Sequence, residues 1–349
     1  MTERMDAATH ECFMRLALAE ARKAIGHTSP NPAVGAILVA KGRILARGHH
    51  REAGQPHAEA ACLRAAKGPI PKDAVLFVTL EPCSTTGRTP PCTKAITAAG
   101  IRHVVVGAID VNPRHAGRGL EELRAAGVNV HSGVLAQECA ALNEAFNHWI
   151  QTRRPFVIAK CGMSLDGKLT RPPGEPQWIT SAAARNHANR LRAQVDAILV
   201  GAETVRKDNP RLTVRAVKTR LQPWRVVLTR SGQLPKRAHL FTDRFAERTL
   251  VFRDRKLKSV LAELGKRQII SLLIEGGGDV LGQALDARLI DRVQIYLAPV
   301  LTGGPIMAFG ALGAGSTAEA ARLRDVRYEK VGAEIFLTGK PTYGAPDPE

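Results

Sequence analysis

The sequence predicts two α/β domains, because strand-like and helix-like segments alternate twice along the chain. Residues 1–150 hold a predicted β-hairpin and further strands separated by helices, which is typical of a three-layer α/β domain. A second alternating pattern occupies residues 151–349, and a length of 349 residues also suits two domains. The stretch from Gln151 to Pro155 is the predicted linker.

The elements expected in the first domain follow its apolar patterning. Residues 11–25 form a helix that Gly26 ends, and residues 33–48 form a hairpin that turns at Lys41-Gly42. The other expected elements are strands over 74–80 and 103–109, helices over 57–66, 92–99 and 119–127, and a long closing helix over 134–151.

The second domain is expected to begin with a strand from Phe156 that runs into a turn. A helix follows with Thr180 or Ser181 as its N-cap. The later expected elements are strands over 197–204, 225–229, 249–252, 269–278 and 291–301, with helices around 258–266 and 279–289. The tail from Pro341 is expected to be loose.

Positive charge is concentrated in the second half. Residues 1–150 hold 17 basic and 13 acidic residues, a net +4, and residues 151–349 hold 33 and 19, a net +14. Such an excess suits phosphorylated small ligands or nucleic acid. Because aromatic residues make up only 4% and no dense basic block interleaves with them, the pattern favours phosphate-bearing metabolites over nucleic acid.

The sequence predicts neither a membrane span nor a disulfide framework. No apolar run approaches the roughly 20 residues of a spanning helix. The first 25 residues carry several acids and indicate an amphipathic helix rather than a signal peptide, so a cytoplasmic location is expected. In that compartment Cys12, Cys62 and Cys139 are interpreted as small core residues.

A metal-binding pattern stands out in the first half. His57-Ala-Glu59 opens a predicted helix, Cys83 follows a predicted strand, and Cys92 opens the next helix. A catalytic zinc keeps three protein ligands and a water, and His57, Cys83 and Cys92 supply such a set. Glu59, two residues from His57, is placed to carry the water's proton to a leaving amine.

The same pattern has a known chemical use. His-x-Glu followed by Pro-Cys-x-x-Cys is the signature of zinc nucleobase deaminases, although here eight residues separate the cysteines rather than two. The competing interpretations are a solvated helix start and a structural zinc site, but no further cysteine lies nearby to complete the latter. His50 is either a pocket wall or a structural contact.

Longer motifs carry a resemblance that covers nearly the whole chain. They are NPAVGAILV (31–39), GHHREAGQPHAEAACL (48–63), TLEPCSTTGRTPPC (79–92), DVNPRHAGRGLEELRAAGVNV (110–130), KCGMSLDGKL (160–169), QWIT (177–180), RLRAQVDAILVGAETVRKDNPRLTVR (190–215) and IEGGGDVLGQAL (274–285). At these motifs the chain resembles the cytidine-deaminase-like superfamily and, more narrowly, the bifunctional deaminase/reductases of riboflavin biosynthesis. It departs from the family's usual residues at Thr85, commonly His, and at Val111, commonly Pro.

The resemblance implies an N-terminal cytidine-deaminase-like domain and a C-terminal dihydrofolate-reductase-like domain that uses NADPH. The first would deaminate a diaminopyrimidinone bearing a phosphoribosylamino group, and the second would reduce the ribosyl group to ribityl. On this resemblance His57, Cys83 and Cys92 hold Zn²⁺ and Glu59 moves the proton. Asn31 and His50 belong to the substrate side.

The resemblance also assigns residues of the second half. The cofactor side comprises Gly162, Trp178, Thr204, Asp208, Ser231, Gly277, Gly278, Asp279, Val280, Leu281, Gly282 and Gln283. The substrate side comprises Pro176, Arg192, Leu212, Arg215 and Glu275, with Lys160 next to the hydride-transfer position. Taken alone, Gly276 to Gly278 fit a tight strand–helix turn as well as a phosphate site, and Lys160 fits a solvated strand end. Arg192 and Arg215 are suited to bind a phosphate, but they fit ordinary surface arginines of a helix and a loop as well.

Further expectations concern the partner, the oligomeric state and two rival functions. The partner is a small phosphorylated pyrimidine, with no nucleic acid or membrane, and a homo-oligomer is expected, a dimer first. The first rival is a zinc deaminase of the tRNA-editing type with an accessory domain, against which the wide interval between Cys83 and Cys92 speaks. The second is a metal protein without catalysis, or a chain with one inactive domain.

Overall fold

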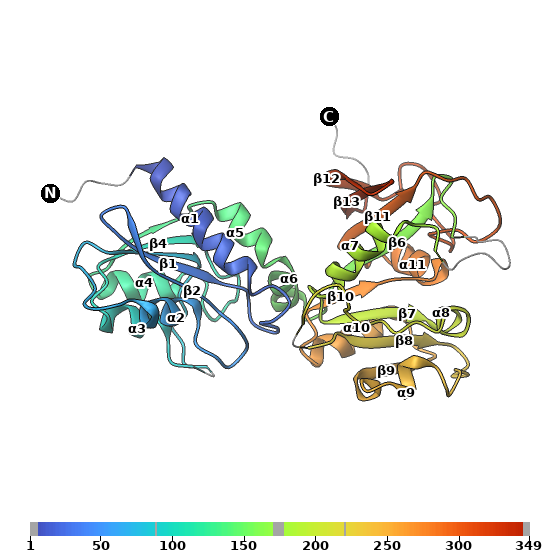
Figure 1. Cartoon of the computed structure of the whole chain (residues 1–349), viewed down its shortest axis with the longest axis horizontal. Coiled ribbons are helices and arrows are strands. Elements are labelled where there is room, and N and C mark those ends of the chain that lie inside the picture. The colour runs from blue at the N-terminus through green and yellow to red at the C-terminus, as the bar shows by residue number, and fades with distance from the viewer. Residues whose placement is uncertain (1–5, 88, 170–177, 220, 345–349) are drawn as a thin grey trace. The chain divides into compact units, whose positions relative to one another are not determined.

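The structure is a computed structural model that describes residues 6–87, 89–169, 178–219 and 221–344. The chain divides into two compact units, residues 1–153 (unit 1) and residues 154–349 (unit 2), shown in Figure 1.

Unit 1 is built on a sheet with strand order β2-β1-β3-β4-β5. Its strands are β1 (Gly35–Ala40), β2 (Arg43–His49), β3 (Val75–Leu80), β4 (His103–Ala108) and β5 (Asn129–Ser132). The β1–β2 hairpin turns through Lys41 and Gly42, both with positive φ, as the sequence predicts. Strand β1 pairs antiparallel with β3, whereas β3, β4 and β5 are parallel to one another.

Helices cover both faces of this sheet, which confirms the three-layer prediction (Figure 1). They are α1 (Ala7–Arg22), α2 (Ala58–Ala65), α3 (Cys92–Ala98), α4 (Arg118–Ala125), α5 (Ala136–Leu142) and α6 (Glu144–Thr152). Glycines allow the layers to approach closely. A Cβ on Gly35 would lie 2.1 Å from the Ala17 carbonyl oxygen in α1, and one on Gly48 would lie 2.4 Å from the Cys62 nitrogen in α2.

The predicted closing helix over 134–151 is wrong as one continuous element. The backbone breaks at Asn143, between α5 and α6, with φ −109° and ψ 26°. The buried Asn143 amide accepts a hydrogen bond from the Ala33 N–H (2.7 Å) and donates one to the Ala33 carbonyl (2.9 Å). The break therefore orients the Asn143 side chain so that it fixes Ala33, in the segment after Asn31. The apolar periodicity of the sequence does not predict this break.

We expect Asn143→Leu to destabilise unit 1 by about 1–3 kcal/mol, because both backbone groups of Ala33 lose their partner. Urea denaturation of the full chain measures this loss. The matched control is Asn147→Leu, since the Asn147 amide donates one bond to Ala140 in the neighbouring helix. Equal effects of the two substitutions would contradict the role assigned to Asn143.

Unit 2 has a larger sheet with strand order β12-β13-β11-β6-β10-β7-β8-β9. Its strands are β6 (Phe156–Ser164), β7 (Ala197–Gly201), β8 (Trp224–Thr229), β9 (Thr249–Arg253), β10 (Ser271–Ile274), β11 (Arg292–Ala298), β12 (Arg322–Val331) and β13 (Glu334–Thr342). Strands β11, β6, β10, β7, β8 and β9 pair in parallel, and the β12–β13 hairpin adds to β11 antiparallel. This hairpin carries the chain beyond the point where a loose tail is expected: Thr342 ends β13, and the Tyr343 hydroxyl donates to the Ile290 carbonyl.

The helices of unit 2 form a layer on each face of the sheet. They are α7 (Ala182–Arg192), α8 (Ala202–Asp208), α9 (His239–Thr242), the 3-10 helix η1 (Ala246–Arg248), α10 (Leu257–Lys266) and α11 (Gly278–Asp286). Helices α10 and α11 pack on one face, while α7, α8 and α9 pack on the other. Ser181, one of the two predicted caps, is the N-cap of α7. The strand predicted over 197–204 instead turns into α8 after Gly201.

Within the described parts of the chain, no helix is long and apolar enough to cross a membrane.

Candidate active sites

Unit 1 brings His57, Cys83 and Cys92 together at the starts of two helices. His57 is the N-cap of α2, Cys92 is the first residue of α3, and Cys83 lies in the loop after β3. Their ligand atoms all lie within 4.8 Å of one another, and among the described residues they form the group able to hold a metal ion.

The spacing of these atoms fits a tetrahedral zinc site. His57 Nδ1 lies 3.5 Å from Cys83 Sγ and 3.3 Å from Cys92 Sγ. Zinc bonds of about 2.1 Å to nitrogen and about 2.3 Å to sulfur, at the tetrahedral angle, would separate the donor atoms by about 3.6 Å. The described residues offer no fourth His, Cys, Asp or Glu to this group, so one coordination position would remain for a water.

The surroundings of Cys83 favour its thiolate. A hydrogen bond from the Cys92 thiol lowers the pKa of Cys83 to about 4 against the effect of burial, and His57 and the Cys92 N–H add to the lowering. The backbone N–H comes from the first turn of α3, where a helix stabilises negative charge. The hydrogen bond of the Cys92 side chain to Cys83, together with burial, raises the pKa of Cys92.

Glu59 lies in the first turn of α2, and the residue is only 3% exposed. Burial and the negative charge of Cys83 raise the pKa of Glu59 to about 7. A carboxyl group with such a pKa can both take up and release a proton near neutral pH. The structure thus places Glu59 beside the metal-binding group, as the spacing of His57-x-Glu59 predicts.

His50 lies beside His57, with their ring centroids 5.1 Å apart. The nearby Pro56 carbonyl lies 3.2 Å from His50 Nδ1, so this nitrogen carries the proton. His50 Nε2 then accepts a hydrogen bond from the Asn31 amide at 3.1 Å. Because burial lowers the pKa of His50, the ring is neutral, and Asn31 is held with a defined orientation next to the site.

Glu81 is a residue whose role sequence reasoning missed. Its buried carboxylate accepts backbone N–H bonds from Asp110 (3.1 Å), Gly117 (2.9 Å) and Gly119 (2.9 Å). It thereby ties the loop before α4 to the segment that carries Cys83. A glutamate at the end of a buried strand was the available signal, but its partners are far away in sequence.

In unit 2, Arg192 and Glu275 form a two-bond ion pair. Arg192 Nε and Nη2 each donate to a Glu275 oxygen at 2.7 Å, and Arg192 Nη1 donates to the Thr213 carbonyl at 3.2 Å. The side chains are 14% and 7% exposed. Arg192 is predicted to bind a phosphate through two hydrogen bonds, but Glu275 occupies one edge of its guanidinium group.

Lys160 lies close to this ion pair. Burial would raise the pKa of Glu275, but the charges of Arg192 and then Lys160 lower it to about 2. Lys160 Nζ also lies 5.8 Å from the centre of the Tyr296 ring. Lys160 therefore lies near the Glu275 carboxylate and the Tyr296 ring rather than at a solvated strand end.

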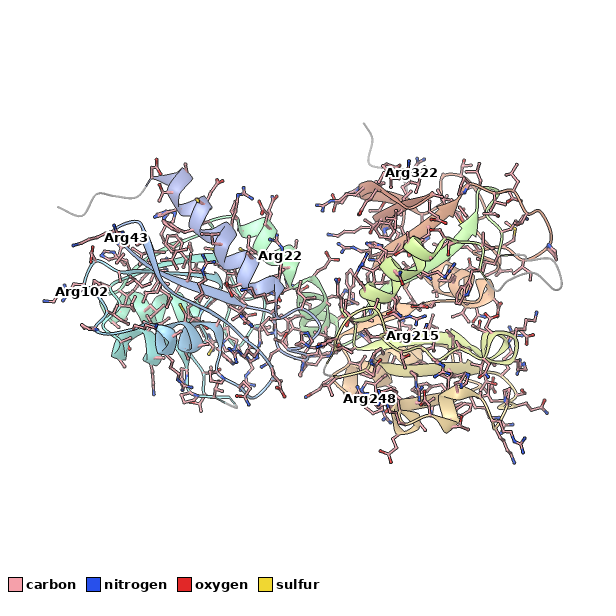
Figure 2. The ribbon with its side chains drawn as sticks, in the orientation of Figure 1. Arg22, Arg43, Arg102, Arg215, Arg248 and Arg322 are labelled. Carbon is pink, nitrogen blue, oxygen red and sulfur yellow. The ribbon has the colours of Figure 1, made fainter. Side chains whose placement is uncertain are left out.

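The other predicted substrate residues differ in exposure. Arg215, labelled in Figure 2, is exposed, and burial and the charge of Arg192 lower its pKa. Leu212 is 2% exposed and packs in a core cluster, so it can offer a ligand only its backbone. Pro176 lies outside the described residues.

The predicted cofactor residues gather where the parallel strands end. Thr204 lies in the first turn of α8 and faces Gly277, the N-cap of α11. The Gly201 N–H donates to the Gly276 carbonyl, which links the two helix starts. Ligands of open α/β sheets bind at this carboxyl edge, and helix starts favour phosphate.

The glycines of α11 serve packing as well. A Cβ on Gly278 would lie 1.9 Å from the Met307 carbonyl oxygen, and one on Gly282 would lie 2.6 Å from Gly310. Val280 and Leu281 are buried in the core, while the exposed Asp279 accepts a hydrogen bond from Gln283. This stretch therefore offers a ligand chiefly the backbone at its start.

The remaining predicted cofactor residues lie on β6, at the end of α8 and in two loops. Gly162 on β6 approaches Thr180, which a Cβ would meet at 2.8 Å. Trp178 is 53% exposed and lies under the Arg185 guanidinium. Ser231 follows β8 and accepts a hydrogen bond from the Gln233 N–H, and Asp208 ends α8.

Comparisons with known proteins match both units. A family model described as the cytidine and deoxycytidylate deaminase zinc-binding region matches residues 7–108, and the RibD C-terminal domain model matches residues 155–337. The riboflavin biosynthesis protein RibD of Aquifex aeolicus is 39% identical over 93% of this chain and 96% of its own length. The Escherichia coli RibD protein is 37% identical over 94% and 98%.

Solved structures match nearly the whole chain. Acinetobacter baumannii RibD superposes with a TM-score of 0.89 at 34% identity, covering 97% of this chain and 100% of that one. A deaminase/reductase from Thermotoga maritima gives 0.86 at 34% identity, covering 96% and 99%. The chain therefore belongs to the RibD family of riboflavin biosynthesis, with a cytidine-deaminase-like N-terminal domain and a C-terminal reductase domain of dihydrofolate-reductase-like fold.

Proposed function

We propose that this chain catalyses two reactions of riboflavin biosynthesis, one in each domain. The deaminase domain (1–150) converts 2,5-diamino-6-(5-phosphoribosylamino)pyrimidin-4-one to 5-amino-6-(5-phosphoribosylamino)uracil, and the reductase domain (151–349) reduces the ribosyl group to ribityl. The observation that carries the proposal is the group of His57, Cys83 and Cys92 with buried Glu59 beside it, in a chain that also carries the reductase unit.

In the first reaction, His57, Cys83 and Cys92 would hold zinc, which makes water a nucleophile at neutral pH. Glu59 takes the proton from the attacking water and delivers it to the amino group that leaves as ammonia. Its pKa of about 7 suits both transfers. Asn31, oriented by neutral His50, holds the pyrimidine edge.

In the second reaction, bound NADPH would supply a hydride for the first carbon of the opened sugar. Thr204, Gly277 and the start of α11 receive the cofactor's phosphates. Lys160 polarises the carbon–nitrogen or carbon–oxygen double bond that is reduced. Glu275, paired with Arg192, holds Lys160 in place. Arg215 is the exposed cation available to the substrate's phosphate, and Pro176 belongs to the same proposed substrate side.

Three finer points belong to the same proposal. The partner is a small phosphorylated pyrimidine rather than nucleic acid, the chain assembles as a homodimer, and it works in the cytoplasm. Sedimentation of the purified protein tests the dimer.

A coupled assay tests both reactions. The diaminopyrimidine substrate is supplied with NADPH, and ammonia release and NADPH consumption are followed with and without a zinc chelator. Chelation should stop ammonia release while sparing the reduction of added deaminated intermediate. Deamination of tRNA without activity on the pyrimidine would refute the proposal in favour of a nucleic-acid deaminase.

Thr89 provides a test of zinc retention that needs no turnover. Its hydroxyl lies 3.3 Å from His57 Nε2, the nitrogen that carries the proton when Nδ1 faces the metal. Partners of this kind fix the ring of a metal-binding histidine, and their loss costs about 10–100-fold in metal affinity. We expect Thr89→Val to lose zinc to a chelator at correspondingly lower chelator concentration, while Thr89→Ser keeps it. Equal retention by both variants would exclude this role.

A further inference from the structure

Gln294 lies in a row of polar side chains on the face of the unit 2 sheet that α7 covers. In the β6–β11 pairing, Gln294 is directly opposite Lys160. In the β6–β10 pairing, Ala159 is opposite Ile274, so the next positions, Lys160 and Glu275, follow on the same line. Because partnered residues of adjacent strands point to the same face, Gln294 flanks Lys160 on the side away from Glu275.

The side-chain oxygen Oε1 of Gln294 lacks a hydrogen-bond partner among the described residues, unlike the polar groups of Glu275 and Tyr296. Glu275 is paired with Arg192, and the Tyr296 hydroxyl lies 2.8 Å from His187 Nδ1. Gln294 is only 9% exposed, yet its Oε1 is buried without a hydrogen bond to any described residue. Leaving a buried carbonyl oxygen without a donor is costly, so this oxygen requires a donor from outside the described residues, and a bound ligand is one source of it.

We propose that Gln294 binds a sugar hydroxyl of the substrate that the reductase domain reduces, and so helps select a ribosyl chain. The inference rests on the proposed reductase function. A sugar hydroxyl is the donor that a carboxamide oxygen lacks here, and Lys160 places the reacting carbon next to Gln294. Since Oε1 makes no hydrogen bond, turning the amide toward the substrate breaks none at that atom.

Gln294→Met tests the assignment, because it removes the amide while keeping an unbranched side chain of similar length. We expect the KM for the deaminated intermediate to rise about tenfold or more, with kcat changed by less than about threefold. The dissociation constant of the ribityl product should rise in parallel, while that of NADPH stays unchanged. The unfolding temperature should stay the same or increase, because an unsatisfied buried polar group is removed.

The full chain supplies its own control, since the deaminase site lies in the other unit and should release ammonia at the wild-type rate. An unchanged KM and product affinity in Gln294→Met would overturn the proposal. A lowered unfolding temperature with kcat and KM altered together would also overturn it, since Gln294 would then be a structural residue. Absence of reduction in the wild-type chain would instead refute the reductase function itself.

Discussion

Glu59→Gln should lower ammonia release by about 10²–10⁴-fold, the range that general acid–base groups contribute. Glutamine keeps the size and a hydrogen-bonding oxygen but cannot take up the water's proton. The residue is buried at the start of α2, beside but not within the group of His57, Cys83 and Cys92. Zinc content, measured by elemental analysis, should therefore remain at the wild-type level.

The second unit makes this experiment internally controlled. NADPH oxidation on added deaminated intermediate should be unchanged in Glu59→Gln, because Glu59 belongs to unit 1 and the reductase residues to unit 2. Cys83→Ser is the contrasting variant, expected to lose both zinc and ammonia release. Persistent ammonia release in Glu59→Gln would show that another group carries the proton.

The elements that build the deaminase site could be predicted because its signals are local. His57 and Glu59 share one helix start, and glycines and prolines mark the loops around Cys83 and Cys92. The hairpin turn at Lys41-Gly42 is equally local, since the glycine lies between two apolar segments and tolerates the positive φ that such a turn requires.

What could not be predicted depends on pairing between distant segments. The helix break at Asn143 follows from two bonds to Ala33, 110 positions away. The partners of Glu81 lie 29 to 38 positions further along the chain. In the same way, Arg192 and Glu275 could be assigned to one side of the site by resemblance, but not to each other. Periodicity reports burial of a face, not which polar groups meet there.

Arg192→Met is the variant expected to have the largest effect on stability. It leaves the Glu275 carboxylate buried without its two-bond partner, and breaking a buried ion pair costs about 3–5 kcal/mol. Because Arg192 is itself 14% exposed, the lower end, about 3 kcal/mol, is expected. Urea denaturation of the full chain, with the transition of unit 2 identified by hydrogen exchange in β10, measures it.

The stability lost in Arg192→Met should depend on pH in a way that identifies the ion pair. In the wild type, the pKa of Glu275 falls from 4.5 to about 2 on folding, so its stabilisation is present above pH 4.5 and is lost as the pH falls toward 2. Without Arg192, fewer cations oppose the effect of burial, so the pKa of Glu275 rises. The stability lost as the pH falls from 4.5 toward 2 should therefore be smaller in the variant than in the wild type. The double variant Arg192→Met/Glu275→Leu should recover most of the stability, because an apolar pair replaces the ionic one, while its reductase activity stays low. Recovery of reduction together with stability would mean that the pair only supports the fold, whereas stability without reduction assigns it to the substrate side of Lys160.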